Sequence, residues 1–512
     1  MRAARRLHPT LILLILLLSA CAPLPPPASL TPSTIVAPSR TSIPIPTVPD
    51  GASPAWDDLS PYRMAMISTA RNDVDVLQHP TQYFIDVLLT LDPPRLTGRE
   101  WVHYTNNEDV PLPKVLFRLF PNAWRQGDTF VSAVAVNGRA AQPSFQLQDS
   151  AMWVPFDDPL QPGQTVDIRV DFSVTVPQDA SANYGAFSYQ EHVLALAHFY
   201  PIVPVYDDEG WNYELAPTYG DVLYSDVSLY QVRFTGPADL TLVSSGITLA
   251  DARHNDGTRT WYLVSGPMRD FYIAASPIYV VSQRWAGETL VSSYYSAPVE
   301  TGGQRVLQWA TDALSVYSRR FGPYPYNELD VVATPTSAGG IEYPGVVAIA
   351  SWLYDQNPGG FFELAVAHEV AHQWFYGLVG SDQIDDPWLD EALAQYCSFL
   401  YFGDIHGSIA GGVVLRAFRT QWKSLPDEED MPIGLPVAAY TPKAYSAIVY
   451  GKGPLFFQAL RERMGDEAFF RFLRRYVAEN RYDIATPERL KAIAEEEAGQ
   501  SLGNLFQDWV GR

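Results

Sequence analysis

The spacing of apolar and polar positions changes near residue 283. Before that point, short runs rich in β-formers are separated by Gly, Asn and Pro; examples are 83–91, 115–120, 166–170 and 229–234. Runs of this length with turn residues between them predict β-strands. We therefore expect residues 61–282 to form a largely antiparallel β domain.

Beyond residue 283, apolar residues recur at helical spacing. From Gln304 to Arg320 they lie three and four positions apart, and the run stops at Phe321-Gly322-Pro323. Residues 329–333 predict a short strand. Further helices are expected at about 362–376, 387–402, 452–464, 466–478 and 487–498. Residues 283–512 are thus expected to form a second, mostly helical domain.

The first 20 residues predict a secretory signal. Three arginines precede an apolar run at 11–18, which is too short to span a bilayer comfortably. The run ends in Leu18-Ser19-Ala20-Cys21, which resembles a bacterial lipobox. That resemblance implies an exported protein, acylated at Cys21 and held at the cell membrane, facing the periplasm or the exterior. An ordinary signal peptide with an incidental cysteine is the alternative.

A linker rich in Pro, Ser and Thr is expected at residues 21–60, between the acylated cysteine and the folded domains. The composition of the whole chain, 47% hydrophobic and 18% charged, is that of a globular protein. The formal net charge of −22 argues against nucleic acid as a partner, because such a surface repels phosphate. Cys397, the only other cysteine, is expected to be a buried small hydrophobe.

A candidate metal site lies in His368-Glu369-Val370-Ala371-His372. Residues four apart share a helix face, so the two imidazoles can bind one ion. After eighteen intervening residues comes Glu391, near the expected start of the next helix. Two histidines and one glutamate leave a fourth zinc position open for water, as hydrolysis requires. We expect one Zn²⁺ per chain, with Glu369 as the general base beside it.

This constellation resembles the gluzincin metallopeptidases, specifically the aminopeptidase N family that includes leukotriene A4 hydrolase. The flanking words His372-Gln373-Trp374-Phe375 and Trp388-Leu389-Asp390-Glu391-Ala392 support the resemblance. It implies a multi-domain fold, in which a saddle-like or sandwich-like antiparallel β domain precedes a thermolysin-like α+β catalytic domain. Larger members continue into a helical domain. Only 62 residues follow Tyr450 here, so we expect that domain to be missing and the cleft to be more open.

Two further words resemble family motifs. Gly339-Gly340-Ile341-Glu342-Tyr343 is similar to the loop G-x-M-E-N. This implies that Glu342, with Gly340 beside it, binds the free amino group of the substrate. Val449-Tyr450-Gly451-Lys452-Gly453 is similar to Y-x-K-G, which implies that Tyr450 stabilises the oxyanion.

Two departures weaken the match for amino-group recognition. Tyr343 replaces the family's Asn, and the stretch Ala197-His198-Phe199-Tyr200-Pro201 lacks the acid of the family's Q-x-E word. Asp207, Asp208 or Glu209 could replace that acid.

The residues together predict zinc-dependent hydrolysis of peptide bonds, with release of N-terminal residues as the favoured activity. Three alternatives stay open: an endopeptidase, a zinc hydrolase with a non-peptide, epoxide-like substrate, and a non-catalytic binding protein. The sequence sets no oligomeric state.

Overall fold

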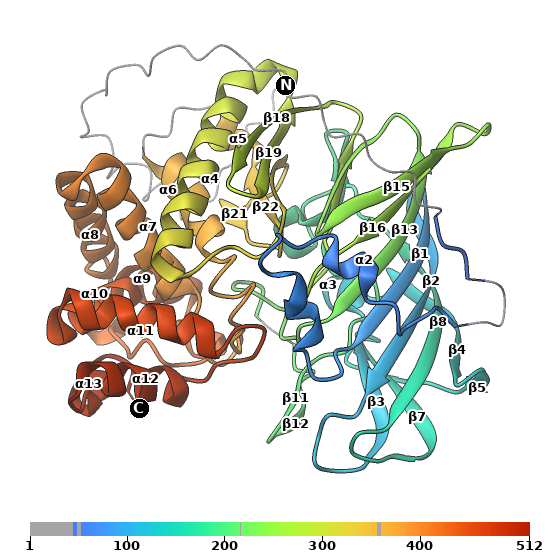
Figure 1. Ribbon diagram of the computed structural model, residues 1–512, viewed down its shortest axis with the longest axis horizontal. Helices are drawn as coiled ribbons and strands as arrows, with labels where there is room; N and C mark the ends of the chain where they lie inside the picture. The colour runs from blue at the N-terminus through green and yellow to red at the C-terminus, as the bar shows by residue number, and fades with distance from the viewer. Residues whose placement is uncertain (1–44, 49–52, 216, 356–359, 512) are drawn as a thin grey trace, which may run out of the picture.

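The computed structural model describes residues 45–48, 53–215, 217–355 and 360–511, and Figure 1 shows a strand-rich half beside a helix-rich half. The expected signal segment, Cys21 and most of the expected linker lie outside the described residues. Among the described residues, no helix has both the length and the apolar character needed to cross a bilayer.

The strand-rich half is built on an eight-stranded sheet with the order β15-β16-β13-β1-β2-β8-β4-β5. Its pairs are antiparallel except β1 with β13, which run parallel. The strands are β1 (Gln82–Leu91), β2 (Pro94–Thr105), β4 (Thr129–Val136), β5 (Arg139–Ala141), β8 (Thr165–Thr175), β13 (Leu229–Pro237), β15 (Ile247–Arg253) and β16 (Thr258–Val264). The expected antiparallel β domain is present, with this one parallel pair.

Alternating burial explains why this sheet has a core face. In β8, Val166, Ile168, Val170 and Phe172 are buried, and the residues between them are only partly buried. Two smaller sheets complete the domain. One pairs β3 (Leu112–Arg118), β7 (Ala151–Leu160) and β6 (Ser144–Gln146), and the other pairs β14 (Thr241–Ser244), β17 (Ile273–Ser276), β10 (Val193–Leu196) and β9 (Phe187–Gln190).

The second domain begins with its own sheet, in the order β18-β19-β20-β22-β21. These strands are β18 (Tyr279–Ala286), β19 (Thr289–Ser296), β20 (Glu328–Thr334), β22 (Val346–Ala350) and β21 (Gly340–Ile341). The expected boundary at 282 falls inside β18. Because β18 pairs with β19 and not with the first domain's sheets, the change of sheet lies between Ser276 and Tyr279.

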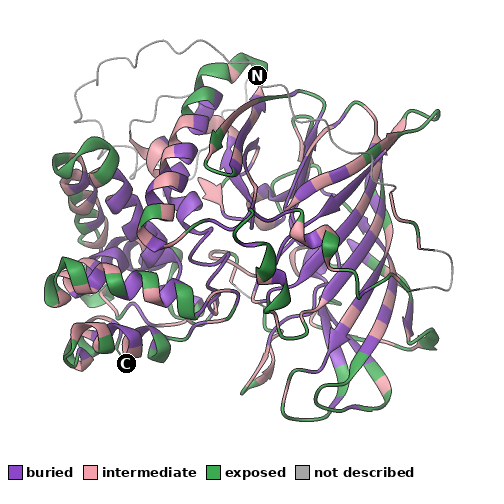
Figure 2. Cartoon of the chain, in the orientation of Figure 1, coloured by how far each residue is buried: buried purple, intermediate pink, exposed green. Residues whose placement is uncertain are grey.

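Helices cover this sheet and fill the rest of the second domain (Figure 1). They are α4 (Glu300–Phe321), α5 (Ser351–Asp355), α6 (Phe361–Ala371), α7 (Glu391–His406), α8 (Ser408–Trp422), α9 (Pro442–Ala447), α10 (Gly453–Met464), α11 (Asp466–Glu479), α12 (Pro487–Ala498) and α13 (Gly503–Trp509). Each long helix expected from the sequence is present. Figure 2 shows buried residues running through both halves and across their junction.

Arg269 joins the two domains. Its guanidinium is buried and donates to three backbone carbonyls: Nε to Tyr376 at 2.9 Å, Nη1 to Ser225 at 3.1 Å, and Nη2 to Asp483 at 2.5 Å. Burial lowers the pKa of Arg269, while the nearby Asp226 opposes that shift. Because Tyr376 follows the metal-binding helix, this contact fixes the loop behind the site.

Glu100 in β2 is a buried acid outside the candidate site. It is fully buried, and neither carboxyl oxygen has a hydrogen-bond partner among the described residues. Burial raises its pKa well above the ordinary value, because the charged form has lost its hydration without gaining a partner.

This shift predicts that Glu100 destabilises the fold as the pH rises. The acid is protonated in both states below its unfolded pKa. Above that pH the folded state retains the proton longer, so stability falls by up to about 1.4 kcal/mol per pH unit until the folded pKa is passed. Glu100→Gln removes this titration. The melting temperature of E100Q relative to wild type should therefore rise between pH 5 and pH 8, while the exposed control Glu209→Gln shows a constant difference. A constant difference for E100Q as well would contradict the prediction.

Candidate metal centre

The first two candidate ligands lie at the end of α6. His368 is in its last turn, and His372 is the residue that caps it. The expected helix 362–376 is therefore too long by five residues. The chain turns because the amide of Gly377 bonds to the carbonyl of His372 at 2.8 Å, and Tyr376 adopts a φ of +119°. The hydrogen bond from the His372 amide to the His368 carbonyl, 3.3 Å, keeps both side chains on one face.

The third candidate, Glu391, is the first residue of α7. This helix was expected to start near Asp386-Pro387. It begins four residues later because Asp390 is the N-cap, and its carboxylate accepts the Glu391 amide at 2.7 Å. Gln383 donates to the other oxygen of Asp390 at 2.9 Å. The cap therefore fixes the backbone from which the Glu391 carboxylate projects.

Three atoms converge between these two helix ends. The His368 Nε2 atom lies 3.1 Å from Nε2 of His372 and 3.1 Å from Oε2 of Glu391, and the remaining side, His372 to Glu391, measures 3.4 Å. Ligands about 2.0–2.1 Å from a tetrahedral zinc ion lie about 3.3 Å from one another. The two imidazole nitrogens and the carboxylate oxygen therefore fit one zinc ion.

The tautomer of His372 supports this fit. Its Nδ1 donates to the carbonyl of Phe375 at 2.9 Å, which leaves the Nε2 lone pair directed at the triangle. His372 is fully buried, and His368 and Glu391 are 7% and 4% exposed. The two Nε2 atoms are 3.1 Å apart, a hydrogen-bond distance, so either a proton or a metal ion can be held between them.

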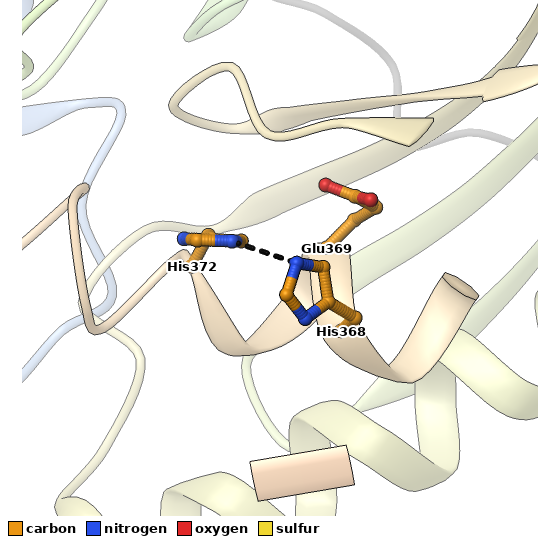
Figure 3. Close-up of side chains that lie close together, drawn as sticks. All are labelled: His368, Glu369 and His372. Carbon is orange, nitrogen blue, oxygen red and sulfur yellow. Dashed lines mark hydrogen bonds between the residues drawn. The ribbon is translucent and has the colours of Figure 1, made fainter. Parts of the chain in front are cut away.

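Glu369 lies close to this triangle without being part of it. One carboxylate oxygen is within 4.8 Å of both imidazoles, so it belongs to the same cluster of possible ligands. Figure 3 shows its carboxylate apart from the paired imidazoles. Glu391 contacts both rings directly, which makes Glu391 the third ligand and leaves Glu369 available as a base.

The electrostatics separate these two acids. Burial raises the pKa of Glu369 well above its ordinary value, and the nearby Glu342 raises it further. Burial would also raise the pKa of Glu391, but hydrogen bonds to His368 and His372 hold it well below the ordinary value. The pKa of Asp390 is raised to about 8, mainly by burial and to a smaller extent by the charge of Glu391. The two acids therefore differ in proton affinity, and Glu369 binds a proton much more strongly than Glu391 does.

The loop with Gly340 and Glu342 packs against the metal-binding helix. A Cβ atom on Gly340 would lie 2.4 Å from Cγ of Glu369, so only glycine allows this approach. Gln373 holds the loop from the helix end: its Oε1 accepts the amide of Gly345 at 2.8 Å, and its Nε2 donates to the carbonyl of Tyr343 at 3.1 Å. Glu342 is 6% exposed.

The structure gives a physical reason for tyrosine at position 343. Its ring stacks on Tyr272 of the first domain, with centroids 4.0 Å apart and planes at 3°. The side chain thus packs at the domain junction. Tyr343 serves the contact between domains, while Glu342 beside it stays near the metal ligands.

Tyr450 lies in a π-helical turn, Ile448–Lys452, between α9 and α10. Its hydroxyl donates to Oε1 of Glu391 at 2.5 Å, and its ring lies 5.9 Å from that of His368. The candidate site residues that fall in the described chain, Gly340, Glu342, His368, Glu369, His372, Glu391 and Tyr450, thus all lie in one cluster. Cys21 is outside the described residues. The openness of the cleft stays a prediction.

One acid of the cluster, Asp221, was not expected from the sequence. It comes from the first domain, and its carboxyl meets that of Glu391 and lies near Glu342. Burial and these neighbours raise its pKa well above the ordinary value. Of the acids expected to serve here, Asp207 instead bonds to Asn212 at 2.8 Å in the hairpin of β11 (Tyr206–Asp207) and β12 (Gly210–Trp211). No motif surrounds Asp221, so only the fold reveals it.

Known proteins share this architecture. The model of the peptidase family M1 domain matches residues 305–509. Aminopeptidase M1-B of Oryza sativa subsp. japonica is 26% identical over 290 residues, which are 54% of this chain and 33% of the relative. The chain thus spans about a third of the length of that curated relative.

Solved structures extend the likeness to both domains. An M1 zinc metallopeptidase from Deinococcus radiodurans superposes with a TM-score of 0.66 at 21% identity, over 85% of this chain and 94% of that one. A variant of that enzyme, bound to a Tyr-Ser-Ala substrate, superposes with a TM-score of 0.62 at 20% sequence identity, with the same coverage of both chains. The β domain followed by a helical catalytic domain is therefore a known arrangement, as expected. His368, Glu369, His372, Glu391 and Tyr450 all lie inside residues 305–509, the segment that is similar to the peptidase family M1 domain.

Proposed function

We propose that the protein is a zinc-dependent aminopeptidase that removes N-terminal residues from peptides. The observation that carries this proposal is the triangle of His368, His372 and Glu391, with Glu369 and Glu342 beside it. The triangle has the dimensions of a zinc site with an open position. Glu342 adds an acid where a free amine can bind.

Glu369 acts as the base. When bound, zinc polarises the scissile carbonyl and makes a bound water more acidic. The Glu369 carboxylate would accept the proton of the attacking water and return it to the leaving amine. Its pKa, raised by burial and by Glu342, suits both steps, because a carboxylate of ordinary pKa is a weak base at neutral pH. Gly340 permits the close approach of the substrate loop to this acid.

Tyr450 stabilises the oxyanion. Its hydroxyl is a donor beside the third ligand, and burial raises its pKa well above the ordinary value, so the proton stays on the oxygen. A neutral donor aimed at the place where negative charge develops lowers the barrier to attack. Its present acceptor, Glu391, gives up this hydrogen bond when the substrate oxygen takes its place.

Glu342 favours exopeptidase action. A buried carboxylate close to the scissile bond binds a substrate ammonium group far better than a neutral internal peptide unit. The similarity to a plant aminopeptidase and to a metallopeptidase with a peptide substrate supports peptides as the substrate class. An epoxide-like substrate has no free amino group for Glu342 to bind, so the position of this acid does not support that alternative.

We further propose that the protein works outside the cytoplasm, tethered by lipid at Cys21. The basic, apolar and small-residue order of residues 1–21 supports export and acylation. The linker rich in Pro, Ser and Thr would hold the catalytic domains away from the membrane.

Glu369→Gln should abolish most turnover without releasing the metal. The amide cannot accept the water proton, so kcat should fall by about 10²- to 10⁴-fold. Initial rates on leucine 4-nitroanilide and zinc content by atomic emission measure the two effects. The exposed control Glu428→Gln should match wild type in both. Normal kcat in E369Q would refute the assigned role.

Glu391→Gln should weaken zinc binding by at least about tenfold, because it replaces a charged ligand by a neutral amide. Competition with a chromogenic chelator gives the affinity directly, without any activity assay. If E391Q held zinc as tightly as wild type while Glu369→Gln lost it, the assignment of ligand and base would be reversed.

Tyr450→Phe should lower kcat by about 10²- to 10³-fold and change KM much less, because the donor acts chiefly as charge develops. Steady-state kinetics on leucine 4-nitroanilide separate the two constants, and a melting curve checks the fold. A rise in KM with unchanged kcat would show that Tyr450 binds substrate instead.

A further inference from the structure

The π-helical turn Ile448–Lys452 carries Tyr450 and joins α9 to α10. Turns of this kind are rare, and they occur frequently at functional sites. Because the direction of a side chain is coupled to the backbone that bears it, the path of this turn sets where the Tyr450 hydroxyl points. The contacts that hold the turn therefore bear on the proposed oxyanion donor.

Two glycines let the turn pack closely on its neighbours. A Cβ atom on Gly451 would lie 2.8 Å from the backbone nitrogen of Trp422, the last residue of α8. A Cβ atom on Gly453 would lie 2.4 Å from Cβ of Ala392, which follows Glu391 in α7. Neither approach leaves room for a side chain. The turn thus packs against both α7 and α8.

Lys452, between these glycines, ties the turn to a third segment. Its ammonium group donates to Oδ1 of Asp430 and to the carbonyl of Met431, both at 2.8 Å. The same ammonium group lies 5.4 Å from the ring centroid of Trp422, whose indole nitrogen donates to Oδ1 of Asp430 at 3.0 Å. The Lys452 side chain is only 10% exposed, so its charge depends on these partners.

The charge state of Asp430 strengthens this contact. Burial would raise the pKa of Asp430, but hydrogen bonds from Lys452 and Trp422 hold the pKa below its ordinary value. Asp430 is therefore ionised at neutral pH, and its hydrogen bond with Lys452 joins two opposite charges. Such bonds are shorter and stronger than bonds between neutral groups.

Lys452 has the placement of a positioning residue. Residues two apart do not share a helix face, so the side chains of Lys452 and Tyr450 leave the turn in different directions. The partners of the ammonium group, Asp430, Met431 and Trp422, lie outside the candidate metal centre. Lys452 can therefore act on the reaction through the turn and not by touching the substrate.

We propose that Lys452 positions Tyr450: its hydrogen bonds to Asp430 and Met431 fix the π-helical turn so that the Tyr450 hydroxyl points to where the oxyanion develops. A displacement of a reacting group by about 1 Å can lower a rate about 100-fold, so a loosened turn costs turnover even where the fold survives. The inference rests on the proposed aminopeptidase function and adds a residue on which that function depends.

Lys452→Met removes the ammonium group and keeps an unbranched side chain. With leucine 4-nitroanilide it should lower kcat by about 10- to 100-fold and change KM by less than about threefold, because the oxyanion donor acts as charge develops. Asp430→Asn keeps the shape of the acceptor and should give a smaller loss of kcat. The exposed control Lys443→Met should match wild type. Zinc content and a melting curve for each variant report on the metal site and the fold.

A second substitution separates positioning of Tyr450 from general destabilisation. In the Tyr450→Phe background, which already lacks the hydroxyl, Lys452→Met should lower kcat by less than about twofold, because its effect passes through that hydroxyl. An equal loss in both backgrounds would overturn the proposal, as would a Lys452→Met variant with wild-type kcat. If Lys452→Met does not fold, Asp430→Asn takes its place in each comparison.

A spectroscopic measurement makes the result independent of turnover. A ring-fluorinated tyrosine in place of Tyr450 gives a fluorine NMR signal that reports the surroundings of the ring. Lys452→Met should shift or broaden this signal, and Lys443→Met should leave it unchanged. An unchanged signal in Lys452→Met would contradict the proposal. If wild type does not cleave the anilide, the proposed aminopeptidase function fails, and the fluorine signal alone decides whether Lys452 positions Tyr450.

Discussion

A concentration of buried carboxyl groups is the constraint on which the site depends. Four carboxyl groups gather at the site, and the residue that carries each is at most 6% exposed: Glu342, Glu369, Asp390 and Glu391. Carboxylates in so dry a place repel one another and have lost their hydration, so they must be neutralised or matched by cations. A divalent metal ion held by His368, His372 and Glu391 would meet part of this requirement.

The backbone achieves the metal geometry with two helix ends. The helix α6 ends just before His372, and α7 starts at Glu391. The candidate ligands therefore lie where the chain changes direction. Three local contacts each immobilise one part of the site. They are the turn after His372, the N-cap at Asp390, and the hydrogen bond from the Gly345 amide to the side chain of Gln373. Such supporting contacts hold ligands in place before the metal binds, which raises affinity.

The sequence predicted the parts of the site that depend on local spacing. His368 and His372 lie four residues apart, and any helical turn brings them together. The strands and long helices followed from periodicity, because burial on one face repeats with the period of the element. The ends of α6 and α7 were wrong by four or five residues, since the bond from the Gly377 amide to the His372 carbonyl and the capping of the Glu391 amide by Asp390 decide where each helix stops or starts, and apolar spacing does not record such bonds.

Contacts between distant segments could not be predicted in this way. Asp221 reaches the ligands only because the first domain packs on the second, and nothing in its neighbouring residues marks it. Tyr343 looked like a departure from a motif, yet its ring packs against Tyr272 across the junction. Both residues depend on how two domains fit together, which no local pattern records.

The buried guanidinium of Arg269 limits how this molecule can move. It binds carbonyls of three separate segments from both domains. Moving the domains apart at this point would break its two charged hydrogen bonds to the second domain, those to Tyr376 and Asp483, together. The seam at Tyr376, four residues beyond His372, should therefore stay closed while peptides enter and leave the site.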